Sequence, residues 1–530
     1  MHGILLFLAL FAALVALHAP LLRLPFFWDE AGYYIPAAHD LFLTGSLIPQ
    51  STVSNAHPPL VLAWLALFWK AFGYSIPAAR IAMLAVAAFA LTGLYRLAER
   101  ANNRTVAIGT VLLTALYPVF FAQSSLAHMD LAVAGLTFWA LREYLDDHRL
   151  AMCIWFALAA LAKETAILAP LALAAWECSR FLFRSDKAQR LFVFPNRSFS
   201  HIVWLVASAI PLALWFAYHY SKMGYVFGNP EFFRYNVQAT THPIRIVFAL
   251  LGRLWQTFVY MGLWAVTALT VFAMTRPALA EDASSETRTR IAIPIQLVLG
   301  VVILAYVGAL SVIGGAVLSR YMLPVVPLFI MIGVSTIWRR LASWRLIVGA
   351  LAVLFIVNWF WNPLYTFPFE DNLAYRDYVQ LHQAGAGYLE ARYPNARVLT
   401  AWPSSDELNR TWLGYVHRPM LLVRMENFSL EPVQAAAASS TPFDVALVFS
   451  TKYEPAFNVA SWPPWVRVRT RFFDYHRDLP PEVIAQMLGA RIVMQEHRGA
   501  QWIAVLAVER PVDAEVRAPT LPQVSGSTRH

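Results

Sequence analysis

Long apolar runs separated by short polar loops follow one another through the first two thirds of the sequence. A membrane-spanning helix needs about 20 predominantly apolar residues, and most of these runs approach that length. The first run is not followed by a small-residue cleavage site, so we expect a retained helix and not a signal peptide. The pattern predicts about eleven spans, at residues 3–22, 77–98, 105–122, 128–145, 149–162, 165–183, 201–220, 245–274, 291–313, 319–337 and 345–361.

Basic residues test this division, because short cytoplasmic loops collect lysine and arginine. Every second loop is basic and carries Arg96, Arg100 and Arg104; Arg142 and Arg149; Arg180, Arg184, Lys187, Arg190 and Arg197; Arg276, Arg288 and Arg290; or Arg339, Arg340 and Arg345. The N-terminus is therefore predicted to be cytoplasmic. The outward segments are then residues 23–76, 123–127, 163–164, 221–244, 314–320 and everything after 361. This division needs the short run Pro59 to Phe72 to lie in the membrane interface, and residues 149–183 to form a hairpin.

The character of the sequence changes after Trp361, where hydropathy falls. Residues 362–510 are long enough for a domain of their own, which we predict to be soluble, extracytoplasmic and α/β. Alternating or β-branched runs predict strands, and 3.6-residue periodicity predicts helices. The predicted strands are 397–401, 420–423, 444–449, 491–495 and 502–508, and the predicted helices are 375–392 and 481–488. The segment 511–530 is rich in Pro, Ser and charge, which predicts disorder.

Composition narrows the class of protein. Of the 530 residues, 58% are hydrophobic and only 14% charged, which excludes an ordinary soluble globular protein. The net charge of +9 sits mostly in the short loops, so it indicates orientation in a membrane and not nucleic-acid binding. The two cysteines, Cys153 and Cys178, lie in apolar runs and give no disulfide framework or thiolate metal site. We therefore predict an all-α polytopic membrane domain over residues 1–361, followed by a small soluble α/β domain.

Carboxylates lie close to the membrane on the outward side. Asp29 and Glu30 follow Trp28 directly after the first span, and Asp130 opens the fourth. Adjacent acids repel one another and an apolar setting disfavours their charged forms, which suits a general base. The alternative for Asp29 and Glu30, as for Asp130, is an acid that stabilises a helix N-terminus. Otherwise Asp130 is an acceptor or a metal contact.

Cations occur on the same side. His57 precedes Pro58 and Pro59, Lys163 and Glu164 form the tip of the predicted hairpin, and Arg320 stands at the outer mouth of the tenth span beside Tyr321. A guanidinium makes bidentate contacts with phosphate oxygens, and lysine or histidine can add to them. The alternatives are a helix cap for His57, a local ion pair at the turn, and a headgroup anchor for Arg320.

In this order, Asp29-Glu30, His57-Pro58-Pro59-Leu60, Lys163-Glu164 and Arg320-Tyr321-Met322-Leu323-Pro324 resemble the dolichyl-phosphate-mannose protein mannosyltransferase and aminoarabinose (ArnT-like) transferase superfamily. The resemblance covers roughly residues 1–340. It implies the GT-C fold of membrane glycosyltransferases. The soluble C-terminal domain looks more like the bacterial branch than the eukaryotic one.

The resemblance also implies a polyprenyl-phosphate-linked sugar donor, an acceptor outside the cytoplasm and an inverting displacement at the anomeric carbon. By position, Asp29 would be the catalytic base or orient the acceptor, with Glu30 beside it. Arg320, Lys163 and His57 would hold the carrier phosphate, with Glu164 and Tyr321 as further substrate or metal contacts. Bacterial aminoarabinose transferases usually carry lysine where this chain has His57, so the sugar is left open. Divalent metal occurs in parts of the superfamily, but no ligand spacing here demands one and the sequence requires no cofactor.

Three other functions are weighed against this one. A transporter or flippase predicts mid-span polar residues and repeated Gly- or Pro-interrupted helices, and neither pattern is clear. An oligosaccharyl ligase usually depends on a large outer loop late in the chain, and none interrupts the spans after residue 244. A membrane anchor for the C-terminal domain would not need eleven spans. We therefore expect a bacterial-type inner-membrane transferase of hexosyl or pentosyl groups, with a glycan, a lipid or a protein as acceptor.

Overall fold

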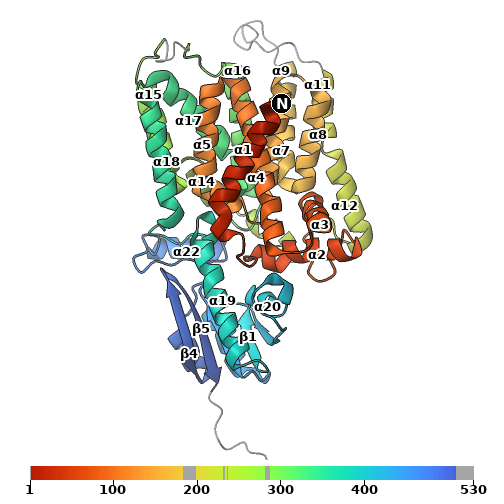
Figure 1. The fold of residues 1–530 in the computed structure, drawn as a ribbon, viewed down its shortest axis with the longest axis vertical. Coiled ribbons are helices and arrows are strands. Elements are labelled where there is room, and N and C mark those ends of the chain that lie inside the picture. The colour runs from red at the N-terminus through yellow and green to blue at the C-terminus, as the bar shows by residue number, and fades with distance from the viewer. Residues whose placement is uncertain are drawn as a thin grey trace, which may run out of the picture.

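The computed structural model describes residues 2–182, 199–228, 230, 233–234, 237–280 and 287–508. Within these residues the chain forms a helical bundle with a small sheet domain at one end (Figure 1). The tail 511–530, for which the sequence predicts disorder, lies outside the described residues. So do Arg184, Lys187, Arg190 and Arg197 of the third basic loop, and parts of the predicted outward loop 221–244.

Each of the eleven predicted spans is helical in the structure. The bundle helices are α1 (His2–His18), α4 (Ile76–Ala101), α5 (Arg104–Leu116), α6 (Pro118–Gln123), α7 (Asp130–Leu145), α8 (Arg149–Ala162), α9 (Leu168–Leu182), α11 (Phe199–Ala207), α12 (Ile210–Met223), α14 (Pro243–Phe258), α15 (Leu263–Met274), α16 (Ile293–Val312), α17 (Val326–Arg340) and α18 (Trp344–Phe360). Among the described residues, five helical stretches are long and apolar enough to cross a membrane. They are Gly3–Leu21, Ile76–Ala101, Phe199–Met223, Pro243–Met274 and Ile293–Val312. The number of spans stays a prediction.

Two predicted spans are interrupted at residues whose backbone angles are not helical. The span 105–122 breaks at Tyr117, which precedes Pro118 and is held out of the helical region with ψ of 125°. The span 245–274 breaks at Met261 and Gly262, both with positive φ. Elsewhere small residues bring helices together: a Cβ on Gly135 of α7 would lie 2.8 Å from Cβ of Ala90 in α4.

The first outward segment forms two short helices at the sheet-domain end of the bundle (Figure 1). A π-helical turn, η2 (Glu30–Tyr34), continues into α2 (Ile35–Thr44), and α3 (Leu60–Phe72) follows. In α3, Leu65 and Trp69 are buried whereas Leu67 and Phe72 are exposed. This two-faced helix occupies the run that the sequence places in the membrane interface.

The C-terminal domain is built on a five-stranded mixed sheet with strand order β2-β1-β3-β5-β4. Its elements are α19 (Ala374–Arg392), β1 (Arg397–Ala401), α20 (Ser404–Glu407), β2 (Leu421–Met425), α21 (Leu430–Ala438), β3 (Val445–Phe449), α22 (Pro463–Phe472), α23 (Pro481–Leu488), β4 (Ala490–Arg498) and β5 (Gln501–Val508). Strands β1, β2 and β3 are parallel, while β5 runs antiparallel to β3 and β4. All five predicted strands and both predicted helices are present, and α20, α21 and α22 are additional.

Aromatic side chains join the sheet domain to the first outward segment. Trp28 lies edge-on to Tyr378 and Trp402, with ring centroids 5.5 and 5.4 Å apart. A Cβ on Gly32 would lie 2.5 Å from the Trp402 ring, so only glycine allows this approach. Trp28 itself has φ of 43°, an uncommon conformation for a non-glycine residue. The packing thus fixes the backbone immediately before Asp29.

Candidate active site

Arg320 is the centre of a buried charged cluster where the bundle meets the sheet domain. It belongs to the short helix η6 (Ser319–Met322) just before α17. Its Nη1 donates to Glu370 at 2.6 Å and its Nη2 to Asp29 at 2.5 Å, while Nε lies 3.5 Å from Oδ2 of Asp130. Its Nη1 also lies 3.2 Å from Nδ1 of His128. One guanidinium therefore gathers three carboxyl groups from distant parts of the chain.

The three carboxyl groups differ in their access to solvent. The side chain of Asp29 is 21% exposed, against 5% for Asp130 and 6% for Glu370. Only Oδ2 of Asp29 takes part in a hydrogen bond among the described residues. Asp29 is therefore the carboxylate of this cluster that an incoming group can reach.

Three buried polar atoms in the cluster have no hydrogen-bond partner in the described structure. They are Nε of Arg320, Oδ2 of Asp130 and Oε1 of Glu370. Nε of Arg320 and Oδ2 of Asp130 face each other as an ion pair at 3.5 Å, so these atoms keep hydrogen-bonding capacity that a ligand could use.

Lys163 and Tyr321 extend the cluster toward the loop between α8 and α9. Lys163 is buried and donates to Oδ1 of Asp130 at 2.7 Å. Its Nζ lies 4.0 Å from the centre of the Tyr321 ring, and the guanidinium carbons of Arg253 and Arg320 lie 5.5 and 5.6 Å from the same centre. Three cations thus surround one aromatic face.

His57 and Glu164 meet at 3.0 Å, although 107 residues separate them. Burial acts to raise the pKa of Glu164, but the interactions with His57 and Lys163 outweigh it and bring that pKa to about 2. Glu164 is therefore an anion at neutral pH, placed directly against His57.

Helix α12 holds the loop that carries His57. The indole of Trp215 donates to the carbonyl of Ala56 at 2.9 Å, and His219 lies 2.8 Å from the hydroxyl of Ser54. Ala56 has a positive φ of 56°, so this contact supports a backbone conformation that is otherwise unfavourable.

Glu370 and Asp371 are site residues that the sequence did not reveal. They form the turn η7 (Phe369–Asp371) after α18, in the segment taken as the start of the soluble domain. Tyr260 donates to Asp371 at 2.6 Å, and the hydroxyl of Ser319 donates to the same carboxylate. Burial raises the pKa of Glu370 to about 8 and that of Asp371 to about 6. Glu370 is consequently mostly protonated at neutral pH.

Glu30, for which the sequence predicts a catalytic role beside Asp29, lies in a separate ion pair with Arg80. It is fully buried and accepts from Arg80 at 2.6 Å and from the backbone amides of Ala127 and Phe27 at 2.5 and 2.8 Å. Arg80 also donates to the carbonyls of Ser125 and Pro25. Both oxygens of Glu30 thus accept hydrogen bonds that hold the loops around Asp29, and its catalytic role stays a prediction.

Arg253 of α14 is a cation that the sequence analysis did not single out. It is buried, and within the described residues no carboxylate accepts from it. Its donors go to Gln256 and to the carbonyls of Leu310, Ala316 and Leu318. It therefore leaves a net positive charge beside Tyr321.

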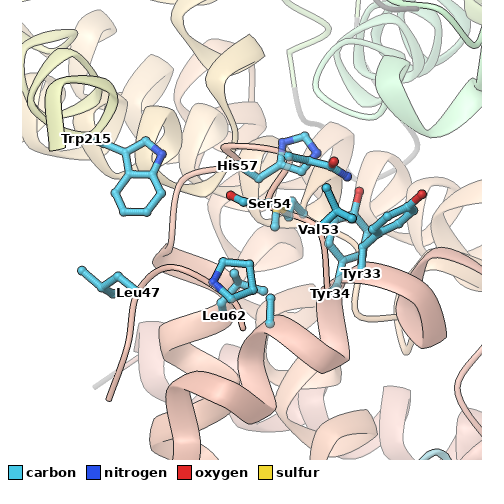
Figure 2. Close-up of a pocket in the computed structure, with 12 residues that line it drawn as sticks. Tyr33, Tyr34, Leu47, Val53, Ser54, His57, Leu62 and Trp215 are labelled. Carbon is cyan, nitrogen blue, oxygen red and sulfur yellow. The ribbon is translucent and has the colours of Figure 1, made fainter. Parts of the chain in front are cut away.

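A small pocket opens beside His57 (Figure 2). Figure 2 shows Trp215 on one side of the His57 loop and the Tyr33–Tyr34 pair on the other. The complete lining is Tyr33, Tyr34, Ala37, Leu47, Pro49, Val53, Ser54, Asn55, His57, Leu62, Met129 and Trp215. Aromatic walls with a few polar groups are typical of small-molecule sites.

The structure brings seven of the eight predicted site residues into two linked clusters. Asp29, Asp130, Lys163, Arg320 and Tyr321 form one, and His57 and Glu164 form the other, which touches the first through Lys163. Glu30 is the exception. Among the described residues, no three His, Cys, Asp or Glu side chains are placed to share a metal ion. Metal dependence stays a prediction.

Comparison with known proteins finds a family that part of the chain matches, and a shared fold. Residues 56–216 match the family dolichyl-phosphate-mannose-protein mannosyltransferase. The fold is similar to that of ArnT from Cupriavidus metallidurans bound to undecaprenyl phosphate, with a TM-score of 0.53 and 14% identity over 95% of this chain and 97% of the other. The apo state of the same protein gives a TM-score of 0.51, with the same identity and coverage. No curated protein sequence matches the chain.

The matched segment carries His57, Asp130, Lys163 and Glu164. The structural similarity extends over nearly the whole of both chains, including the sheet domain. The resemblance read from the motifs is thereby confirmed, and this multi-pass membrane protein has the GT-C fold of the mannosyltransferase-like and ArnT-like membrane glycosyltransferases.

Proposed function

We propose that this protein transfers a hexosyl or pentosyl group from a polyprenyl-phosphate-linked donor to an acceptor on the extracytoplasmic side of the membrane. The observation that carries the proposal is the Arg320 cluster, in which one reachable carboxylate stands among buried cations. The kinship with a family named for dolichyl-phosphate-mannose, and with a structure that holds undecaprenyl phosphate, supports a lipid phosphate as carrier.

Asp29 is the base in this proposal. It takes the proton of the acceptor hydroxyl, whose oxygen then forms a bond to the anomeric carbon from the face opposite the phosphate. The bond from that carbon to the phosphate oxygen breaks, and the carrier phosphate leaves with the electron pair. A single displacement of this kind inverts the anomeric configuration. The salt bridge to Arg320 orients Asp29 through Oδ2, and its other oxygen is left to accept the proton.

The departing phosphate needs positive charge, because negative charge accumulates on it as the bond breaks. Arg320 and Lys163 are already neutralised in part by Asp29 and Asp130, whereas Arg253 is paired only with carbonyl and amide oxygens among the described residues. We therefore add Arg253 to Arg320, Lys163 and His57 as ligands of the carrier phosphate. Their common position around Tyr321 and Glu164 supports a single phosphate site.

The test is transfer of radiolabelled sugar from a panel of polyprenyl-phosphate sugars to acceptor membranes by the purified protein in nanodiscs. We expect transfer by the wild type and a loss of roughly 10²–10⁴-fold in rate for Asp29→Asn, the range for removal of a general base. Glu482→Gln, an equivalent change at an exposed position of α23, should leave the rate unchanged.

Two results would count against the proposal. Transfer at the wild-type rate by Asp29→Asn removes Asp29 as the base. Absence of transfer from every donor, by folded protein that binds polyprenyl phosphate, removes the transferase function and favours movement of the lipid across the membrane.

A further inference from the structure

An exposed apolar segment lies in the C-terminal domain close to the bundle. Residues 457–462 lead into α22, and the side chains of Phe457, Val459 and Trp462 are 71%, 57% and 66% exposed. Large apolar side chains gathered at one place on a soluble domain usually mark a contact surface.

This segment is tied to the end of the last predicted span. The backbone amide of Val459 donates to the carbonyl of Leu364 at 2.9 Å, and Asn458 donates to the hydroxyl of Thr366 at 2.9 Å. Leu364 follows the end of α18 by four residues and is itself exposed, as is Trp361. The apolar surface therefore continues from the lipid-facing end of a bundle helix onto the sheet domain.

Helix α22 holds this surface against the end of the bundle through contacts with α14. Its Trp465 packs against Phe248 of α14 with ring centroids 5.4 Å apart, and Phe472 lies 4.9 Å from the ring of His242. Figure 1 shows α22 at the junction of bundle and sheet domain, beside the end of α18. None of its residues is buried.

All charged side chains of this segment are basic. Residues 457–472 contain Arg467, Arg469 and Arg471 and no acidic residue, and Arg467 and Arg471 are exposed. Tryptophan and phenylalanine side chains enter the boundary between headgroups and acyl chains, and arginine is attracted to an anionic lipid surface.

We propose that residues 457–472, with Trp361 and Leu364, form a surface that docks on the lipid headgroups of the outer leaflet. The aromatic side chains enter the interface, and Arg467 and Arg471 contact lipid phosphates. The surface lies next to the site, because Arg245 of α14 donates to the carbonyl of Phe472 and to those of Gly314 and Gly315, in the loop that leads to Arg320. Docking therefore holds the sheet domain over the bundle from the lipid side.

The test measures the depth of spin labels in full-length protein in nanodiscs. Cys153 and Cys178 are replaced by alanine, and a nitroxide is attached to a single cysteine at position 457 or 462. The measured quantity is the ratio of accessibility to oxygen, which enriches in lipid, over accessibility to a water-soluble nickel chelate. Val353, exposed in the middle of α18, gives the lipid reference. Leu421 gives the water reference, because it is 60% exposed and lies at the start of β2. Strand β2 is parallel to β1, and β1 begins near the end of α19 that is far from the bundle.

We expect labels at 457 and 462 to give ratios several-fold above that at 421 and closer to that at 353. Ratios equal to that at 421 would overturn the proposal. So would dipolar broadening between labels at 457, which would show that a second copy of the chain covers this face.

A second measurement examines the arginines. In nanodiscs that contain phosphatidylglycerol, the ratio at 457 should rise above its value in phosphatidylcholine alone. The double variant Arg467→Gln/Arg471→Gln should lose this rise. A rise that persists in the double variant, or no rise in the parent protein, would refute the proposed contact with lipid phosphates.

Discussion

Two neighbouring acids, Asp29 and Glu30, each pair with a buried arginine, yet the two pairs are built differently. Glu30 and Arg80 satisfy each other and also bond to backbone groups on several loops. Asp29 and Arg320 stand among further carboxyl groups, next to polar atoms that make no hydrogen bond in the described residues, and Asp29 is partly exposed to solvent. The first pair is complete and serves structure, whereas the second is incomplete and has capacity left for a substrate.

The comparison shows why position in sequence could not separate the two acids. Successive residues of a helix point in directions about 100° apart, so Asp29 and Glu30 necessarily face different neighbours. The packing of Trp28 on Trp402 and Tyr378 decides which of them faces the cluster. That packing depends on two residues that lie 350 and 374 positions further along the chain.

The largest expected effect is a loss of stability when the Glu30–Arg80 pair is broken. Glu30→Gln leaves the guanidinium of Arg80 buried without its counter-ion, and loss of one partner of a buried pair costs about 3–5 kcal/mol. We expect a clearly lowered unfolding midpoint in detergent, followed by intrinsic tryptophan fluorescence. Asp29→Asn, by contrast, should unfold close to the wild type because Asp29 is partly solvated. A Glu30→Gln protein that is as stable as wild type but inactive would instead make Glu30 catalytic.

A smaller effect is expected on donor use when a cation of the incomplete cluster is removed. Lys163→Gln loses a charged hydrogen-bond donor worth about 1.5–3 kcal/mol, which corresponds to roughly 10–150-fold in kcat/KM for the donor. Lys70→Gln, at an exposed position of α3, is the matched control and should change nothing. An unchanged kcat/KM in Lys163→Gln would place the carrier phosphate elsewhere.

Glu370 allows the same cluster to be examined through pH. Burial raises its pKa to about 8, so ionisation above that pH adds a negative charge beside Arg320 and should weaken binding of the donor phosphate. We expect kcat/KM for the donor to fall as pH rises through about 8, and Glu370→Gln to remove this fall while keeping activity at pH 7. Because the folded pKa is raised above the ordinary value of 4.5, the associated stability is present at low pH and is lost as pH approaches 8. An alkaline fall that survives in Glu370→Gln would assign it to another group.

Much of the fold follows from local patterns that the sequence displays directly. Short β-rich strands such as Arg397–Ala401 and long apolar runs such as Ile293–Val312 can be recognised in the sequence from their composition and length. The helix α22 was missed because Pro463 and Pro464 and three arginines obscure its pattern. The bounds of the interrupted spans also depend on tertiary contacts, as at Met261 and Gly262.

The sequence predicted which residues gather on the outward side of the membrane, but it did not predict which of them contact one another. Glu370 lies 50 residues beyond Arg320 and after the last span, in a segment that reads as the start of a soluble domain. A signal was nevertheless present, since Glu370 and Asp371 form an adjacent acid pair shortly after a span, as Asp29 and Glu30 do. What the sequence could not show is that both pairs converge on the same bundle mouth.

The smallest expected effect concerns a residue that acts through another. Trp215→Phe keeps the aromatic wall of the pocket but removes the hydrogen bond to Ala56, worth about 1 kcal/mol, and so loosens the backbone that presents His57. We expect kcat/KM for the donor to fall about fivefold, measured by the same transfer assay. Trp204→Phe, on the exposed side of α11, is the matched control.

A double variant decides whether Trp215 works through His57. If the indole only positions the imidazole, Trp215→Phe should have no further effect once His57→Gln has removed the imidazole, since the two changes share one consequence. Effects that multiply in the double variant would show that Trp215 contacts the substrate itself from the pocket wall. Such a result would extend the incomplete cluster around Arg320 into the aromatic pocket, and would make the pocket part of the recognition of the donor.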